Sequence, residues 1–224
     1  VQADELGYIN ANGDLTLLSD QGDIGVANGK GLRVKVANDK VISAEADSIY
    51  IKGYGDSAKI TFDKLNARDG SIGIDSKIWD VVLKSVTNAK NLEFIVRSVN
   101  QIAGSLNVSN LLNIITDNGV TLTSESNKVP QISVVNNKSG DVLFMNNGDL
   151  TINKAVNKAE KGKLVFVNKG AVTAKEGLSS KGAALIWAKG DIDVQKDSDS
   201  KKWMGLYAEN GGIKTKSLNV GSIN

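Results

Sequence analysis

The chain contains no cysteine and no histidine among its 224 residues. Disulfide bonds, thiol nucleophiles, imidazole bases and the usual zinc ligands are therefore excluded, and most familiar catalytic arrangements are excluded with them. The lack of cysteine suits a large exported chain that crosses the periplasm unfolded, because no wrong disulfide can form on the way.

Long apolar runs and patches of one charge are also missing. No stretch approaches the roughly 18 apolar residues of a membrane span, so we expect no membrane insertion by this segment. The net charge is +2, and lysine and aspartate are interspersed along the chain, which leaves no basic stripe for nucleic acid. The sequence begins at Val1 without a start methionine or an apolar signal stretch, and we expect an internal fragment or a processed segment.

Proline is nearly absent, at 1 residue, whereas glycine is frequent, at 23. This balance is typical of a protein with many turns of positive φ and few rigid ones. Between the turns lie short runs of strand composition, such as LTLLS at 15, LRVKV at 32 and LEFIV at 92. The nearest candidate for a helix, IWDVVLKSVTNA from Ile78, is too rich in β-branched residues. The pattern predicts an all-β protein.

The last third of the chain repeats itself. VLFMNNGDLTI from Val142 aligns without gaps with LVFVNKGAVTA from Leu164, ALIWAKGDIDV from Ala184 and GLYAENGGIKT from Gly205, at offsets of 22, 20 and 21 residues. Such a unit cannot bury its apolar face alone, but it can when it stacks in register on its neighbours. The sequence therefore predicts a right-handed parallel β-helix with about 20–22 residues per coil and on the order of ten or eleven coils.

The glycine of each repeat predicts a corner of the coil, because glycine provides left-handed backbone and Asn or Asp can hydrogen-bond the turn locally. After the corner, strict alternation predicts one inward ladder of Leu150, Val172, Ile192 and Ile213. The repeat pattern loosens at about 76–131, where we expect looser coils or inserted loops. Otherwise residues 1–224 are expected to form a single β-helix segment.

Before the corner, the same alternation points the position of Leu143 inward and the next position outward. Either the outward column forms an exposed apolar interaction strip, or this strand is buried on both faces under a loop or at a bulge. Trp79 and Trp203 stand beside charged residues and are further candidates for exposed contact residues, although isolated exposed aromatics usually carry no function. The column of the possible strip consists of Phe144, Phe166, Ile186 and Tyr207.

No metal site or catalytic pair is indicated. Calcium-binding β-helices need a tandem G-G-x-G-x-D-x-U-x motif, which is missing, and DSDSKK at 197–202 lacks the glycine and final glutamate of an EF-hand loop. The carboxylates after the corner glycines recur on alternate coils, about 10 Å apart by twice the strand spacing, which is just beyond the range of an inverting glycosidase. We expect no catalytic residue, metal or cofactor. The residues at this position are Asp149, Ala171, Asp191 and Gly212.

The run NGDLTLLSDQGDIGVANGKGLRVKV from Asn12, followed by SIYIKGYGDSAKITFDKLNARDGSIGID from Ser48, resembles the repeat regions of very large filamentous adhesins exported by two-partner secretion. The resemblance is closest to the fusobacterial leukotoxin type and is clearest in residues 12–75 and 140–220. Gly-Asp-Leu-Thr-Leu units occur across many filamentous haemagglutinin-like proteins. The family implies a secreted or surface-attached rod that adheres to host cells or, in the leukotoxin type, injures white blood cells. The amino-terminal secretion domain of the family is not in this sequence, and no catalytic residues carry over.

Repeats and resemblance together predict a non-enzymatic shaft segment of a bacterial adhesin or leukotoxin, a virulence factor secreted by or attached to the outer surface of a Gram-negative cell. The expected partners are a protein or glycan on host leukocytes or endothelial cells, and the outer-membrane transporter during export of the full-length protein. The alternative is a carbohydrate-active β-helix enzyme, either a polysaccharide lyase or a glycosidase, which activity on a panel of polysaccharides would reveal.

Overall fold

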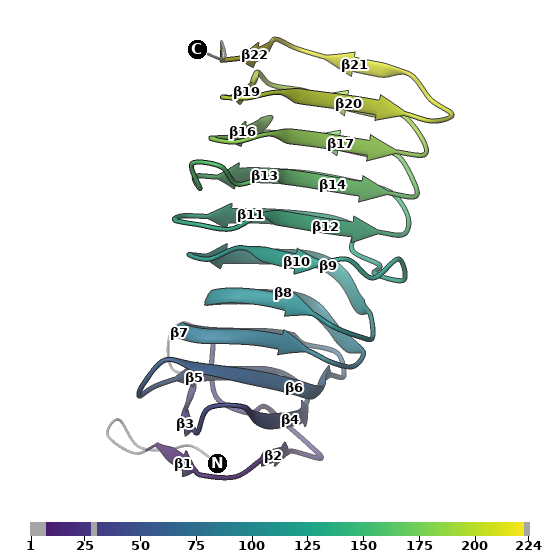
Figure 1. Cartoon of the computed structure of the whole chain (residues 1–224). Helices are drawn as coiled ribbons and strands as arrows, with labels where there is room; N and C mark the ends of the chain where they lie inside the picture. The colour runs from purple at the N-terminus through teal and green to yellow at the C-terminus, as the bar shows by residue number, and fades with distance from the viewer. Residues whose placement is uncertain (1–7, 28–30, 222–224) are drawn as a thin grey trace.

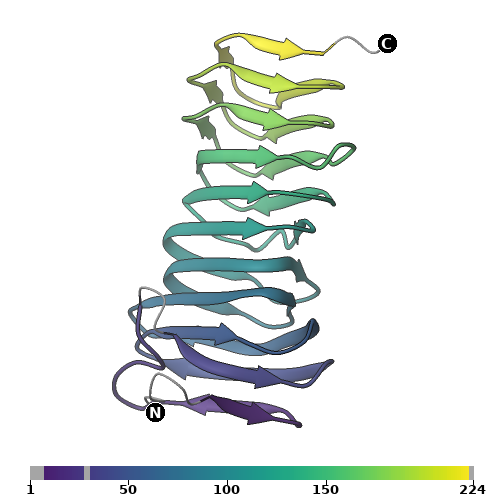
Figure 2. The same cartoon turned by 90° about the vertical axis from the view of Figure 1, so that its left-hand side faces the viewer.

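The computed structural model describes residues 8–27 and 31–221, and every regular element in these ranges is a β-strand. The strands lie above one another in one rod, with the earliest strands at one end and the latest at the other (Figure 1; Figure 2). This part of the chain contains no helix long and apolar enough to cross a membrane. The strands are β1 Ile9–Ala11, β2 Leu15–Leu18, β3 Leu32–Val36, β4 Lys40–Ala46, β5 Ile49–Gly53, β6 Ala58–Ala67, β7 Ser71–Leu83, β8 Thr87–Gln101, β9 Leu106–Thr116, β10 Val120–Leu122, β11 Gln131–Asn136, β12 Val142–Asn146, β13 Leu150–Asn157, β14 Leu164–Asn168, β15 Val172–Ala174, β16 Leu178–Ser180, β17 Ala184–Ala188, β18 Ile192–Val194, β19 Ser198–Ser200, β20 Met204–Ala208, β21 Ile213–Thr215 and β22 Leu218–Val220.

The coils have three faces, which are easiest to define in the last turns. Face B consists of β12, β14, β17 and β20, face C of the first half of β13 with β15, β18 and β21, and face A of the second half of β13 with β16, β19 and β22. Neighbouring strands on each face pair in parallel, and the chain winds in a right-handed sense (Figure 1). The predicted parallel β-helix is confirmed.

The length of each turn is close to the expected one. On face B, successive strands pair in register with steps of 22, 20 and 20 residues, from 142 to 164, 184 and 204. The rod has about nine turns and not ten or eleven. The first coil is longer, because Ile9 lies opposite Val34, a step of 25 residues. At about 4.8 Å per turn, the rod is roughly 40 Å long.

The predicted inward ladder is also confirmed. Leu150 lies opposite Val172, Val172 opposite Ile192, and Ile192 opposite Ile213. The first three side chains are 2%, 1% and 1% exposed. Ile213 is 48% exposed, because it belongs to the last described coil and no later coil covers it. Below it, the inward side chains of all three faces form one contiguous apolar core.

The stretch 76–131 meets the expectation of looser coils or inserted loops only in part. It contains most of the three longest strands, β7, β8 and β9, of 13, 15 and 11 residues, and only residues 123–130 form a long connection. These strands turn from face to face at small register shifts, such as the one between Ser76 and Asp80, without a glycine corner. Trp79, expected as an exposed contact residue, lies in this shift and is fully buried. Its ring packs on Gly53 so closely that a side chain at position 53 would clash with it.

The Gly-Asp corners link each coil to the next. Gly148 has a φ of 120°, a conformation that other residues rarely adopt. The Oδ1 atom of Asp149 accepts a hydrogen bond of 2.9 Å from the backbone N–H of Ala171, one coil later. A Cβ on Gly170 would lie 2.5 Å from that oxygen, so the glycine of the following coil leaves space for the carboxylate. The corner motif therefore serves the architecture, as the sequence suggests.

Asparagine ladders run inside the rod, where apolar residues are the norm. Asn146 and Asn168 on face B, like Asn136 and Asn157 on face A, are 0–2% exposed. The Nδ2 atom of Asn146 donates to Oδ1 of Asn168 at 3.0 Å, and its own Oδ1 accepts from the N–H of Val129 at 2.8 Å. Asn136 donates to Asn157 in the same way, at 3.0 Å. These bonds avoid the cost of about 1–3 kcal/mol of each buried, unpaired polar group.

Ion pairs link the coils on the outside of the rod. The most buried of them joins Asp80 to Arg97, whose Nε lies 2.8 Å from Oδ1 of the carboxylate. The hydroxyl of Ser98 also donates to Asp80, at 2.6 Å. The hydrogen bond from Arg97, assisted by that from Ser98, lowers the pKa of the Asp80 carboxyl against the opposing effect of desolvation, and the pKa of Arg97 is raised in return.

Replacement of Asn146 by alanine tests the internal ladders. We expect Asn146→Ala to reduce the free energy of unfolding by about 2–3 kcal/mol, because the buried N–H of Val129 and Oδ1 of Asn168 lose their partner. Asn110→Ala removes an exposed hydrogen bond to Asn91 and should cost less than about 1 kcal/mol. Urea denaturation followed by circular dichroism measures both values. Equal losses would show that the internal ladder contributes no more than a surface contact.

The Asp80 pair predicts a pH dependence of stability. Because the folded-state pKa of Asp80 is lowered, its contribution is present above the unfolded pKa of about 3.9 and is lost as pH falls through the folded pKa. Asp80→Asn should therefore reduce stability at pH 7 by about 1 kcal/mol after solvent screening, and this difference should disappear in acid. Melting temperatures between pH 7 and pH 2 check it, with Glu209→Gln, outside any described ion pair, as the control. A pH-independent difference would contradict the charge-based explanation.

Candidate interaction surface

The structure divides the four residues of the predicted strip. Phe144, Phe166 and Ile186 are 1%, 0% and 0% exposed, whereas Tyr207 is 53% exposed. The rings of Phe144 and Phe166 meet edge to face inside the rod, with their centroids 6.1 Å apart. The outward placement of the first three residues is therefore wrong, and they are core residues. The strand is not buried on both faces either, because its other side chains are only half-buried.

Tyr207 differs from the other three because the gapless alignment fails in the fourth repeat. The register places Leu206 opposite Ile186, and Tyr207 opposite Trp187. Three residues separate β17 from β18, whereas four residues, 209–212, separate β20 from β21. The gapless alignment ignores this extra corner residue and therefore places the residues of β20 one position out of register. In an alternating strand an error of one position assigns every side chain to the wrong face.

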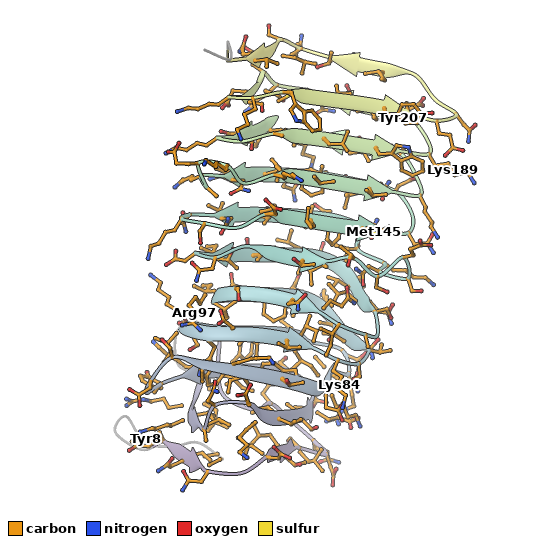
Figure 3. All side chains as sticks on the ribbon, in the orientation of Figure 1. Tyr8, Lys84, Arg97, Met145, Lys189 and Tyr207 are labelled. Carbon is orange, nitrogen blue, oxygen red and sulfur yellow. The ribbon has the colours of Figure 1, made fainter. Side chains whose placement is uncertain are left out.

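Two outward columns on face B form a continuous apolar surface. Trp187 and Tyr207 lie with their rings nearly parallel, at 13°, and their centroids 6.3 Å apart. Trp203, 48% exposed as expected from the sequence, covers Gly205 beside them. Figure 3 shows Met145 and Tyr207 near the ends of β12 and β20 on the face toward the viewer. We define the outer apolar strip as Leu143, Met145, Val165, Val167, Leu185, Trp187, Trp203 and Tyr207.

The other two faces of the same coils provide an internal comparison. The outward column of face C is polar throughout, and that of face A becomes polar after its first residue. A parallel strand that is apolar at every position normally has both faces covered. The strip measures on the order of 300 Å² by strand spacing and residue rise, a patch size that often marks a contact site on a soluble protein. The compared columns are Thr151, Thr173, Asp193 and Lys214 on face C, and Val156, Ser179, Asp199 and Asn219 on face A.

Charged residues border the strip on both sides. Lys169 follows β14 and its Nζ lies 2.8 Å from Oε2 of Glu125, a contact that lowers the pKa of the Glu125 carboxyl. Lys189 follows β17 at the equivalent corner (Figure 3). At the opposite border, the N–H of Lys163 donates to Oδ1 of Asp141 at 2.7 Å. An apolar centre with a polar rim is the usual composition of a protein contact surface.

The carboxylates considered for catalysis or calcium have structural partners. Asp149 and Asp191 each accept a backbone N–H from the next coil, the latter from Gly212 at 2.7 Å. In the segment 197–202, Asp197 accepts from the N–H of Ser217 at 3.2 Å, and Ser198–Ser200 form strand β19. No group of three or more acidic residues suited to a metal ion occurs among the residues that the structure describes.

Sequence reasoning missed the outer apolar strip because the runs VLFMN and LVFVN are apolar at every position. In such a run, the alternation of apolar and polar residues does not show which side chains point inward. One signal was nevertheless present. Three residues separate Ala188 from Ile192, whereas four separate Ala208 from Ile213, which indicates an insertion at the corner of the fourth repeat.

Two adjacent substitutions test which face is outward. Phe166→Ser should destabilise the protein by about 3–5 kcal/mol, because it opens a cavity in the core. Val167→Ser, one residue later and on the outer side, should cost less than about 1 kcal/mol. Thermal or urea denaturation measures both. If Val167→Ser were the more destabilising change, the orientation of the strip would be incorrect.

Comparisons of the chain with protein-family models, with curated protein sequences and with solved structures find no match. The functional argument therefore depends on the geometry of the rod and of its outer apolar strip, together with the repeat pattern of the sequence.

Proposed function

We propose that this chain is a shaft segment of a large filamentous adhesin of the leukotoxin type, exported by two-partner secretion to the surface or surroundings of a Gram-negative bacterium. In this proposal the segment is not an enzyme. It keeps a stiff shape and contacts a protein of the host-cell surface through the outer apolar strip. The observation that carries the proposal is the apolar outer face B of the last four coils, where the outward columns of the other two faces are mainly polar.

The stiffness follows from the way the coils are joined. Each turn is bonded to the next by three parallel ladders, by corner carboxylates such as Asp149, and by internal amides such as Asn146. Because parallel pairing joins each described strand to the coils beside it, bending the rod would break backbone hydrogen bonds. A rod of this kind suits a spacer that holds a contact surface away from the bacterial cell.

The contact role follows from the position of the strip. Its residues repeat along the rod at about 4.8 Å, so several weak contacts would add to one another along an extended partner surface. A protein on leukocytes or endothelial cells is the partner class that the resemblance implies. During export, the full-length protein would also pass through its outer-membrane transporter.

The alternative function, a polysaccharide lyase or glycosidase, uses the same kind of fold. Fold alone does not decide between the two, because function resides in the site. The corner carboxylates Asp149 and Asp191 accept backbone N–H groups, an arrangement that favours a structural role. Release of reducing ends or unsaturated products from a polysaccharide panel would support the enzyme.

Binding of the purified protein to leukocytes and endothelial cells, measured by flow cytometry, tests the proposal. A triple variant, Met145→Ser, Trp187→Ser and Tyr207→Ser, should keep its melting temperature within a few degrees and bind at least about tenfold more weakly, because it removes apolar contact area from the strip.

The matched control changes three outward residues of face C in the same coils, Thr151→Ala, Thr173→Ala and Lys214→Ala, and should bind as the parent protein does. Equal loss in both triple variants would exclude the strip as the contact surface. Failure of the parent protein to bind either cell type above the level of an unrelated β-helix would contradict the adhesive function itself.

A further inference from the structure

A groove on face A lies in the earlier half of the rod, away from the outer apolar strip. It crosses the outer side of β5, β7, β8 and β9 and has a volume of about 460 Å³. This volume is within the range of small-molecule sites, about 300–1,000 Å³. Its lining combines an aromatic ring, carboxylates, an amine and amides.

The shape of the groove depends on Gly73. In successive coils one outward column contains Tyr50, Gly73, Glu93 and Asn113. A Cβ on Gly73 would lie 3.1 Å from Cδ1 of Tyr50, so the missing side chain allows the tyrosine ring to lean across the neighbouring strand. A bulky residue between Tyr50 and Glu93 would fill the hollow.

The polar side chains of the groove are held by one another. Asn113 donates from Nδ2 to Oε1 of Glu93 at 2.7 Å, and Nζ of Lys52 lies 3.9 Å from Oδ2 of Asp75. These contacts use only part of the bonding capacity of each group, because a carboxylate has about four acceptor sites and an ammonium three donors. The remaining donors and acceptors are available to a ligand that brings several hydroxyl groups.

We propose that this groove binds a neutral oligosaccharide. Sugar hydroxyls both donate and accept, and adjacent hydroxyls can meet the Glu93 carboxylate and the Asn113 amide together. The C–H face of a pyranose is apolar and slightly positive, which suits the negative face of the Tyr50 ring. Ile95 and Leu111, which also line the groove, add apolar contact without competing hydrogen bonds.

The charge of the groove selects among glycans. Its lining contains one cation, Lys52, and two carboxylates, Asp75 and Glu93, which gives +1 − 2 = −1. Lys52 is already beside Asp75, so the Glu93 charge is the one that meets a ligand. Sialylated and sulfated glycans would be repelled by this carboxylate, whereas neutral sugars would use it as an acceptor.

An oligosaccharide array tests the inference. The purified protein is applied to neutral, sialylated and sulfated glycans, and the strongest neutral ligand is then titrated by calorimetry. We expect binding restricted to neutral glycans. Tyr50→Ala and Glu93→Gln should each weaken it by at least about tenfold, since each removes one stacking or charge-assisted contact. Glu209→Gln, which makes the same change as Glu93→Gln outside the lining of the groove, is the matched control and should leave the affinity unchanged.

Several outcomes would overturn the assignment: no binding to any neutral glycan, a preference for acidic glycans, or an affinity of folded Tyr50→Ala and Glu93→Gln that is unchanged from the parent protein. Glu93→Gln preserves the size of the side chain and an acceptor for Asn113, so it decides the question if Tyr50→Ala does not fold. Cleavage of the bound glycan would contradict the non-enzymatic function and would leave glycan binding itself in place, so the two proposals can fail separately. Loss of cell binding by the variants of the outer apolar strip would leave the groove assignment intact.

Discussion

Parallel stacking in register is the constraint on which the rest of this protein depends. Each strand completes its backbone hydrogen bonds only through the coils before and after it, so every side chain lies about 4.8 Å from its equivalent. The side chains of an inward column must therefore pack on the side chains at the same position in the neighbouring coils, as Phe144 packs on Phe166. Outward columns face solvent and are free to vary. A column that is apolar on the outside, as on face B, is thus a feature that the fold itself does not require.

The same constraint explains which parts of the structure could be predicted from the sequence. Glycine corners and the alternation after them leave a clear repeat, so the coil and the ladder of Leu150 and Val172 were correctly predicted. The phase of VLFMN could not be predicted, because its residues are apolar on both sides. Asn146 resembles a turn residue until its bonds to the neighbouring coils are known. Inside β7 and β8 the chain passes from one face to the next at register shifts and without glycine, so the repeat pattern was difficult to recognise there in the sequence.

Two surfaces of different chemistry share one framework. The outer apolar strip occupies face B of the later coils and provides contact area, whereas the groove occupies face A of the earlier coils and provides directed polar groups. Both consist of outward side chains, so either could change without disturbing the ladders beneath. The ion pairs between coils, such as Asp80 with Arg97, belong to the same outer layer and stabilise the framework that both surfaces share.

The ion pairs also give the rod a direction. Of the ten pairs between described residues, nine have the carboxylate in the earlier coil and the cation in the later one, and only the pair of Lys52 and Asp75 is reversed. Corner carboxylates such as Asp149 likewise accept an N–H from the following coil. Each coil therefore presents carboxylates whose cationic or N–H partners belong to the next coil. Because each coil contacts only its neighbours, folding of such a rod can propagate turn by turn along its axis.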